Sequence, residues 1–321
     1  DQKPDEILDG IRVLGFEPSA PWRATGLLRK CDADVYHSQE PSFGTYLARR
    51  AMPHRTHVVT CRETRELSDW LTEVRHPSLS RLQVLINLTY EDNLLVQRAV
   101  RQADGVYCAA QFLRAKAQRK YGLPKAPRFL PTPVAVPPTI RKASQPTVCY
   151  LARWDRRKRP ELFLELARKF PEVRFIALGN SRDKEYEKQL RQQYAGFANL
   201  TMPGYVDQFG SPEVSRILSE SWVLVNTAVR EGLPNAFLEA AAHGCAILSA
   251  VDPDGFASRF GAVVRKDDFA AGLGELLQDD RWRARGVAGR RYIGETFELE
   301  RAIDAHLEVY HQIMNQKRAS A

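Results

Sequence analysis

The sequence lacks any long apolar run: no stretch of about eighteen uncharged apolar residues occurs, which excludes a membrane-spanning helix. Aromatic residues make up only 9% of the 321 residues, and the few cysteines are scattered and odd in number: Cys31, Cys61, Cys108, Cys149 and Cys245. None is spaced CxxC, so the pattern argues against a disulfide framework and against a zinc site, and it favours a reducing cytoplasm.

The start of the chain also lacks the features of a signal peptide. It opens DQKPDE, without a Met, a basic segment or an apolar segment. We expect that residues upstream of this start have been removed.

The net charge of +8 lies almost wholly in the first half. Residues 1–145 contain 22 Lys and Arg against 15 Asp and Glu, whereas the remainder contains 25 against 24. A basic half indicates an anionic partner, such as a phospholipid surface or a phosphorylated acceptor, and the alternative is a solvated surface with no specific partner. Nucleic acid is the weakest choice, and we predict none, because no RNP, helix-turn-helix or finger pattern accompanies the charge.

Proline marks the organisation of the chain. Seven of the nineteen prolines lie between Pro124 and Pro146, which predicts an interdomain connection that its apolar residues keep packed. The length also favours two domains. We therefore predict a first domain over residues 1–140, a second over 141–298, and a C-terminal helix over 299–321 that packs back on the first.

The second half alternates apolar strands with helices. TVCYLA, VRFIALG, WVLVNTAV and CAILSA read as strands, and SPEVSRILSE reads as a helix with Ser211 as its N-cap and Pro212 at the first helical position. In the first half, IRVLGF, DVYHS, HVVTC and GVYCAA are strand candidates. This alternation predicts an α/β protein with two doubly wound, Rossmann-like domains.

The turn after WVLVNTAV carries the first candidate site. Glu231 lies in a strand-to-helix turn, Gly232 allows close approach of the backbone, and Pro234 starts a helix whose free amides form an anion site. Glu239 follows about 7–8 Å further along that helix. The separation suits one elongated ligand that the two glutamates hold by hydroxyl groups at its two ends, with its phosphates near the helix start between them, as in a sugar nucleotide. A surface turn with a solvated glutamate is the alternative.

A second constellation follows the strand TVCYLA, in YLARWDRRKRP. Arg153 and Lys158 are placed to neutralise a leaving diphosphate, although the loop alone could be an exposed basic one. The DxD pairs Asp32–Asp34 and Asp252–Asp254 occur at the frequency expected by chance, so we predict no metal and no cofactor. Gly272-Leu273-Gly274 lies in a helical pattern and is not a dinucleotide loop.

Together these motifs, with the GYV at Gly204, resemble the C-terminal domain of glycosyltransferase family 4, a group of retaining enzymes with the GT-B fold. The resemblance spans residues 147–314. It implies that Arg153 and Lys158 hold the donor diphosphate, with Glu231 on the donor sugar and Glu239 on ribose. It further implies a donor site lined by Gly204, Val206, Gly232, Leu233, Pro234 and Asn235. Ala152 and Pro234 replace glycines of the commonest pattern.

The first half resembles the family's acceptor-side domain less closely. His37 and Glu40 follow a strand, and Arg62 stands where many relatives place a His, so these three are candidates for the acceptor side. His37 could equally be a buried strand-end histidine, and Arg62 cannot act as a base near neutral pH. The family's first strand and glycine-rich loop are not found, so we expect an incomplete N-terminal domain.

The resemblance implies a retaining, metal-independent glycosyltransferase of the hexosyltransferase type. It would move sugar from a nucleoside-diphosphate sugar to a hydroxyl of a glycan, a lipid-linked or a small-molecule acceptor. The basic half suggests peripheral contact with the inner face of the membrane. A nucleotide-sugar binding protein without transferase activity and a GT-B epimerase remain alternatives.

Overall fold

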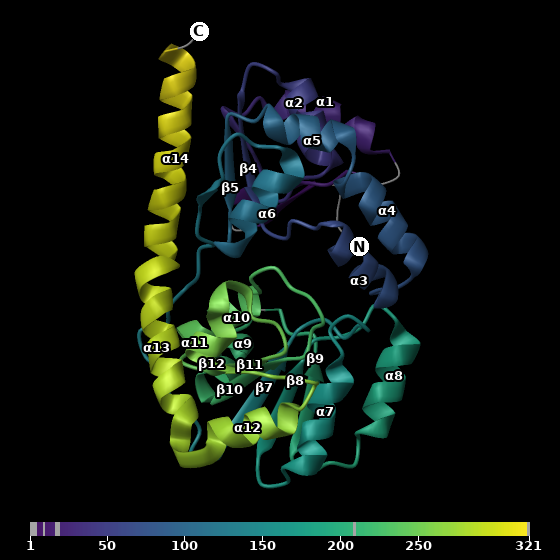
Figure 1. Ribbon diagram of the computed structural model, residues 1–321, viewed down its shortest axis with the longest axis vertical. Coiled ribbons are helices and arrows are strands. Elements are labelled where there is room, and N and C mark those ends of the chain that lie inside the picture. The colour runs from purple at the N-terminus through teal and green to yellow at the C-terminus, as the bar shows by residue number, and fades with distance from the viewer. Residues whose placement is uncertain (1–4, 9, 17–19, 208–209, 320–321) are drawn as a thin grey trace. The chain divides into compact units, whose positions relative to one another are not determined.

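A computed structural model describes residues 5–8, 10–16, 20–207 and 210–319. The first four residues, which open the chain, lie outside this part. The chain divides into two compact units. One comprises Asp1–Thr64, Leu85–Leu130 and His306–Ala321, and the other Arg65–Val84 and Pro131–Ala305. Figure 1 shows the elements of both units. The domain boundaries at residues 140 and 298 remain predictions.

The second unit contains a six-stranded parallel sheet. Its strand order is β12 (Gly261–Val263), β11 (Ala246–Ser249), β10 (Val223–Asn226), β7 (Thr147–Leu151), β8 (Arg174–Leu178) and β9 (Leu200–Gly204). The chain proceeds outward from β7 through β8 and β9, and then returns to build β10, β11 and β12 on the other side of β7. The sheet is therefore doubly wound, as predicted, and its order reverses between β7 and β10.

Apolar side chains fix the helices on this sheet. Val148 and Tyr150 of β7 pack with Phe163 of α7 (Pro160–Lys169) and Leu273 of α12 (Phe269–Leu277), so α7 and α12 cover one face. Elsewhere α10 (Asn235–Ala242), α11 (Phe256–Phe260) and α13 (Arg281–Thr296) pack on one another. The same unit contains α3 (Leu67–Arg75), α8 (Lys184–Gln193), α9 (Glu213–Glu220) and the 3₁₀ turns Pro253–Gly255 and Gln278–Asp280.

The first unit contains a four-stranded parallel sheet in the described residues. Its order is β3 (Val35–Ser38), β4 (Thr56–Cys61), β5 (Gly105–Cys108) and β6 (Arg128–Phe129). Its helices are α1 (Ala24–Cys31) after the 3₁₀ turn Pro21–Arg23, α2 (Phe43–Ala51), α5 (Leu94–Arg101) and α6 (Phe112–Tyr121). The helix α4 (Arg81–Glu91) begins in the second unit and ends in the first. The last helix, α14 (Leu299–Ala319), contributes its residues from His306 onward to the first unit.

The prediction that IRVLGF is a strand of a Rossmann-like sheet was wrong. It forms β2 (Ile11–Leu14), which pairs antiparallel with β1 (Asp5–Leu8) in a separate two-stranded sheet. Gly10 has φ +78° between the two strands, a backbone conformation that glycine adopts without strain. The dipeptide Asp-Gly between two short apolar runs is a hairpin signal that the strand prediction overlooked.

Two helix starts were predicted one residue too early. The helix α9 begins at Glu213 with Pro212 as its N-cap, and the Ser211 hydroxyl accepts a hydrogen bond from the Glu213 amide at 3.2 Å. The helix α10 likewise begins at Asn235, with Pro234 as its N-cap. In both cases the proline lies just before the first helical residue.

The proline-rich connection is packed, as predicted. It contributes β6 to the first sheet, its Leu130 and Val134 are buried, and Val134 forms a parallel bridge with Glu298. None of the helices in the described residues has the length and apolarity that a bilayer crossing requires.

Candidate functional site

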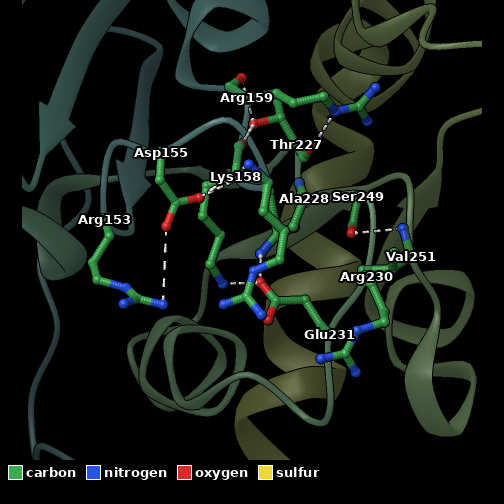
Figure 2. A network of polar contacts seen from close by, with 12 residues as sticks. Arg153, Asp155, Lys158, Arg159, Thr227, Ala228, Arg230, Glu231, Ser249 and Val251 are labelled. Atoms are coloured by element: carbon green, nitrogen blue, oxygen red, sulfur yellow. Dashed lines mark hydrogen bonds and ion pairs between the residues drawn. The ribbon is translucent and has the colours of Figure 1, made fainter. Parts of the chain in front are cut away.

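The candidate site lies at the carboxyl edge of the six-stranded sheet, where the strand order reverses. The loop 152–159 follows β7, and the turn 227–234 follows the neighbouring strand β10. In doubly wound sheets this reversal point opens a crevice in which ligands bind. Figure 2 shows that side chains of the loop and the turn face one another here.

An ion pair joins the loop to the turn. The Lys158 ammonium contacts Oε1 of Glu231, and both side chains are largely buried, with 14% and 8% of their surfaces exposed. The amide nitrogen Nδ2 of Asn226 donates a second hydrogen bond to the same oxygen at 3.2 Å. Because the two side chains are largely buried and in contact, their orientations are fixed. A ligand at this point of the sheet would therefore meet a cation and a carboxylate side by side.

Backbone contacts hold the loop after β7 in one conformation. Asp155 Oδ1 accepts hydrogen bonds from the amides of Arg157 and Lys158 at 3.1 and 2.9 Å. The Tyr150 hydroxyl donates to the Lys158 carbonyl at 3.1 Å, and the Thr227 hydroxyl lies 2.5 Å from the same oxygen. Lys158 is therefore placed by both neighbouring strands before any ligand arrives, which is the property that electrostatic catalysis requires.

Arg153 lies at the start of the same loop. Its side chain is half exposed, and Nη2 lies 3.9 Å from the Asp155 carboxylate. At this distance in a solvated position the pair holds the guanidinium only weakly. Arg153 is thus available at the mouth of the loop, whereas Lys158 is fixed deeper within it.

The helix α10 starts directly after the turn. Gly232 is buried, Leu233 and Pro234 are partly buried, and Asn235 is exposed as the first helical residue. The first amides of a helix carry partial positive charge and attract phosphate groups. The turn and this helix start therefore offer donors next to the ion pair.

Glu239 lies on α10, partly buried. Burial is the cause that raises the pKa of its carboxyl group above the usual value. Glu239 lies four residues after Asn235, the first residue of α10, and therefore about one helical turn from the helix start.

Gly204 and Val206 lie further along the same edge. Gly204 ends β9 with φ +92°, and its carbonyl accepts a hydrogen bond from the Gly179 amide at 2.8 Å. Gly179 itself has φ +117°, and a Cβ there would lie 1.9 Å from the Ala152 carbonyl oxygen. The loop after β8 can thus approach the loop after β7 only because residue 179 is glycine.

Three candidates of the first unit lie together at the ends of β3 and β4. His37 contacts the Tyr310 hydroxyl through Nδ1 at 2.6 Å and the Thr60 hydroxyl through Nε2 at 2.7 Å. Burial, followed by the positive charges of His306 and Arg62, lowers the pKa of His37 to about 4. The Glu40 carboxylate accepts hydrogen bonds from the amides of Arg62 and Glu63 at 2.6 and 2.8 Å, so it shapes the loop after β4.

The two DxD pairs have other partners. Asp32 and Asp34 both pair with Arg55, and Asp252 accepts hydrogen bonds from the amides of Ala257 and Ser258 at the start of α11. Within the described ranges, no group of three or more His, Cys, Asp or Glu side chains could hold a metal ion. Gly272-Leu273-Gly274 lies inside α12, as predicted.

Comparison with known families gives two adjacent matches. Residues 4–136 match the family described as Glycosyltransferase Family 4, and residues 145–279 match the family described as Glycosyl transferases group 1. A comparison with curated protein sequences gives no significant match.

Solved structures resemble the chain over most of its length. A sucrose-phosphate synthase from Thermosynechococcus elongatus is 16% identical, with a TM-score of 0.72 over 98% of this chain and 87% of that one. HepE from Anabaena, in complex with UDP and glucose, is 11% identical, with a TM-score of 0.64 over 92% and 81%. The pneumococcal O-GlcNAc transferase GtfA, in complex with UDP and GlcNAc, is 13% identical, with a TM-score of 0.66 over 97% and 69%.

Proposed function

Because the chain belongs to the family 4 glycosyltransferases and has their GT-B fold of two Rossmann-like domains, we propose that it is a retaining, metal-independent hexosyltransferase. The donor is a nucleoside-diphosphate sugar, and the acceptor is a hydroxyl group. In the reaction the bond from the sugar to the diphosphate breaks, and a bond from the same carbon to the acceptor oxygen forms on the same face. The leaving phosphate takes the acceptor proton.

The observation that carries the proposal is the Lys158–Glu231 ion pair at the reversal point of the sheet. Lys158, with Arg153, supplies positive charge where the diphosphate departs, and the start of α10 adds backbone donors. Glu231 contacts the donor sugar and Glu239 the ribose hydroxyls. Gly232, Leu233, Pro234 and Asn235 line the sugar and phosphates, and Gly204 and Val206 belong to the same donor site.

No metal or other cofactor is needed in this proposal. In other transferases a divalent ion stabilises the negative charge that develops on the leaving group. Here the side chains of Lys158 and Arg153 have that role.

The proposed acceptor side includes His37, Glu40 and Arg62 of the first unit. The acceptor is a glycan, a lipid-linked compound or a small molecule, and not a nucleic acid. The excess positive charge of residues 1–145 favours peripheral contact with an anionic membrane face. We place the reaction in the cytoplasm, since Cys61, Cys108, Cys149 and Cys245 are buried free thiols.

The first experiment is a thermal-shift panel with UDP, GDP, ADP and their common sugar conjugates. A ligand at a hundred times its Kd adds about 2.7 kcal/mol to the free energy of unfolding, which raises the melting temperature visibly. UDP sugars come first, because HepE and GtfA were solved with UDP. We expect a base-selective rise that Glu239→Ala abolishes.

Transfer is then assayed by NMR with the donor identified in the panel. Retention of the anomeric configuration is the expected result. Inversion would overturn the retaining assignment, and release of free epimerised sugar nucleotide would identify an epimerase instead.

A further inference from the structure

A carboxylate outside the donor motifs binds both loops of the site. Glu73 lies on α3, in the segment Arg65–Val84 that belongs to the second unit. Only 9% of its side chain is exposed. Its Oε1 lies 2.7 Å from Nη1 of Arg157 and 2.6 Å from Nη2 of Arg230, and 3.5 Å from Nε of Arg65.

The two arginines flank the proposed donor-site residues in sequence. Arg157 directly precedes Lys158, and Arg230 directly precedes Glu231. Both are largely buried, with 8% and 10% of their side chains exposed. The Val229 amide also donates a hydrogen bond to the Arg157 carbonyl at 3.1 Å. The carboxylate of Glu73 therefore joins the loop after β7 to the turn after β10 from the side of α3.

The contact needs the negative charge. Two guanidinium groups that share one oxygen are close enough to repel each other strongly in a buried setting, unless that oxygen is anionic. The cations of Arg157 and Arg230 act against burial and keep the pKa of Glu73 below its usual value, so the carboxylate is ionised at neutral pH. An uncharged side chain at residue 73 would leave the repulsion between the two loops uncompensated.

We propose that Glu73 is a positioning residue for sugar transfer: it holds Arg157 and Arg230 together, so that Lys158 and Glu231 face the donor diphosphate and sugar in a fixed geometry. The inference rests on the proposed function. It adds a residue from the first quarter of the sequence, to which the family resemblance assigns no role.

The test is a double-mutant cycle on nucleotide binding, measured by calorimetry with whichever of UDP, GDP and ADP the wild-type chain binds. The variants are Glu73→Gln, Lys158→Ala and the double variant. We expect Glu73→Gln to raise the Kd about tenfold in the wild-type background and less than twofold in the Lys158→Ala background. Coupling of this kind is the signature of residues that act through one another, whereas independent effects would multiply.

Glu220→Gln is the matched control. Glu220 also pairs with two arginines, Arg174 and Arg216, but Arg174 lies at the start of β8, on the opposite edge of the same sheet. We expect this variant to bind the nucleotide within twofold of wild type. Glu73→Asp, which keeps the charge, should recover part of the affinity that Glu73→Gln loses.

The outcomes separate the two proposals. If the wild-type chain binds none of the three nucleotides, the proposed function is wrong. If it binds one and Glu73→Gln binds it equally well, or if the effects of the two substitutions multiply, the role of Glu73 is wrong and the proposed function stands. Should Glu73→Gln fail to fold, Arg157→Lys takes its place in the cycle, since it keeps the charge but loses the planar fork that faces Glu73.

Discussion

Lys158 and Glu231 form a buried ion pair although 73 residues separate them in the chain. The pair exists because β7 and β10 are neighbours, so the loop that follows one strand meets the turn that follows the other. In the absence of donor, each group neutralises the other. A diphosphate must therefore compete with Glu231 for the Lys158 ammonium, which gives the first prediction.

Glu231→Gln should separate nucleotide binding from transfer. The substitution removes the carboxylate that competes for Lys158, so we expect the Kd for the nucleoside diphosphate to fall about threefold or stay unchanged. Transfer should fall at least a hundredfold, or about 3 kcal/mol in activation free energy, because the contact with the reacting sugar is lost. Calorimetry and an initial-rate assay measure the two effects. Equal losses in binding and rate would contradict the competition.

Glu239→Gln should stabilise the free protein and weaken donor binding. Since burial raises the pKa of Glu239, folding disfavours its charged form. The preference of the folded state for the protonated carboxyl stabilises the protein fully below the pKa that Glu239 has in the unfolded chain. This stabilisation is lost as the pH rises through the pKa in the folded state. We expect the variant to be more stable than wild type at pH 7 and equal to it below pH 4 or so.

Urea unfolding at pH 7 and at acid pH checks this, and calorimetry with the nucleotide checks the binding loss. If the variant and wild type have the same free energy of unfolding at pH 7, burial of the charged Glu239 carboxylate does not destabilise the protein, and this prediction is wrong.

These two glutamates show how much the sequence could predict. The apolar run WVLVNTAV and the small-residue segment NAFLEAAAHG predicted a strand, a turn and a helix around Glu231 and Glu239, and the structure contains all three. Local patterns suffice there because a strand and the helix after it are set by nearby residues. The loop YLARWDRRKRP was harder, since a run of charges reads as exposed. In fact Arg157 is buried and Arg153 is half exposed.

The contact of Arg157 with Glu73 spans 84 residues and has no local signal. The sequence also gives no signal for the hydrogen bonds of Asp155 and Thr227 to the backbone of the loop, because Asp and Thr are common after strands. Only the strand order brings them together.

His37 should make the protein less stable in acid. Its pKa in the folded state is about 4, below the ordinary value of 6.5, so the folded protein favours the neutral ring. This contribution is present above pH 6.5 and is lost as pH falls from 6.5 towards 4. Discounted for partial exposure, the loss is about 2 kcal/mol. His37→Gln should remove this part of the pH dependence, as measured by the difference in urea unfolding between pH 7 and pH 4.5.

Membrane contact should depend on charge and on one helix face. Leu85 and Ile86 of α4 are about half exposed and lie together at helical spacing with Leu82. We expect binding to vesicles that contain anionic lipid, weakened by 0.5 M salt, because screening shortens the reach of surface charges. Ile86→Glu should lower the bound fraction in a sedimentation assay.

Val287→Glu controls for the loss of an exposed apolar residue elsewhere, since Val287 lies on α13 and is 67% exposed. Binding that salt leaves unchanged would contradict an electrostatic contact.

Transfer should continue when divalent ions are removed. In the proposed mechanism Lys158, Arg153 and the amides at the start of α10 stabilise the leaving diphosphate in place of a metal ion. We expect the initial rate in EDTA to stay within twofold of the rate in Mg²⁺ or Mn²⁺. Lys158→Ala provides the reciprocal test: with the ammonium removed, added Mg²⁺ should recover part of the lost rate by taking over charge neutralisation. A wild-type rate that collapses in EDTA would show that these side chains do not replace a metal. The carboxylates of the turn, and Glu231 first, would then be the candidate metal ligands.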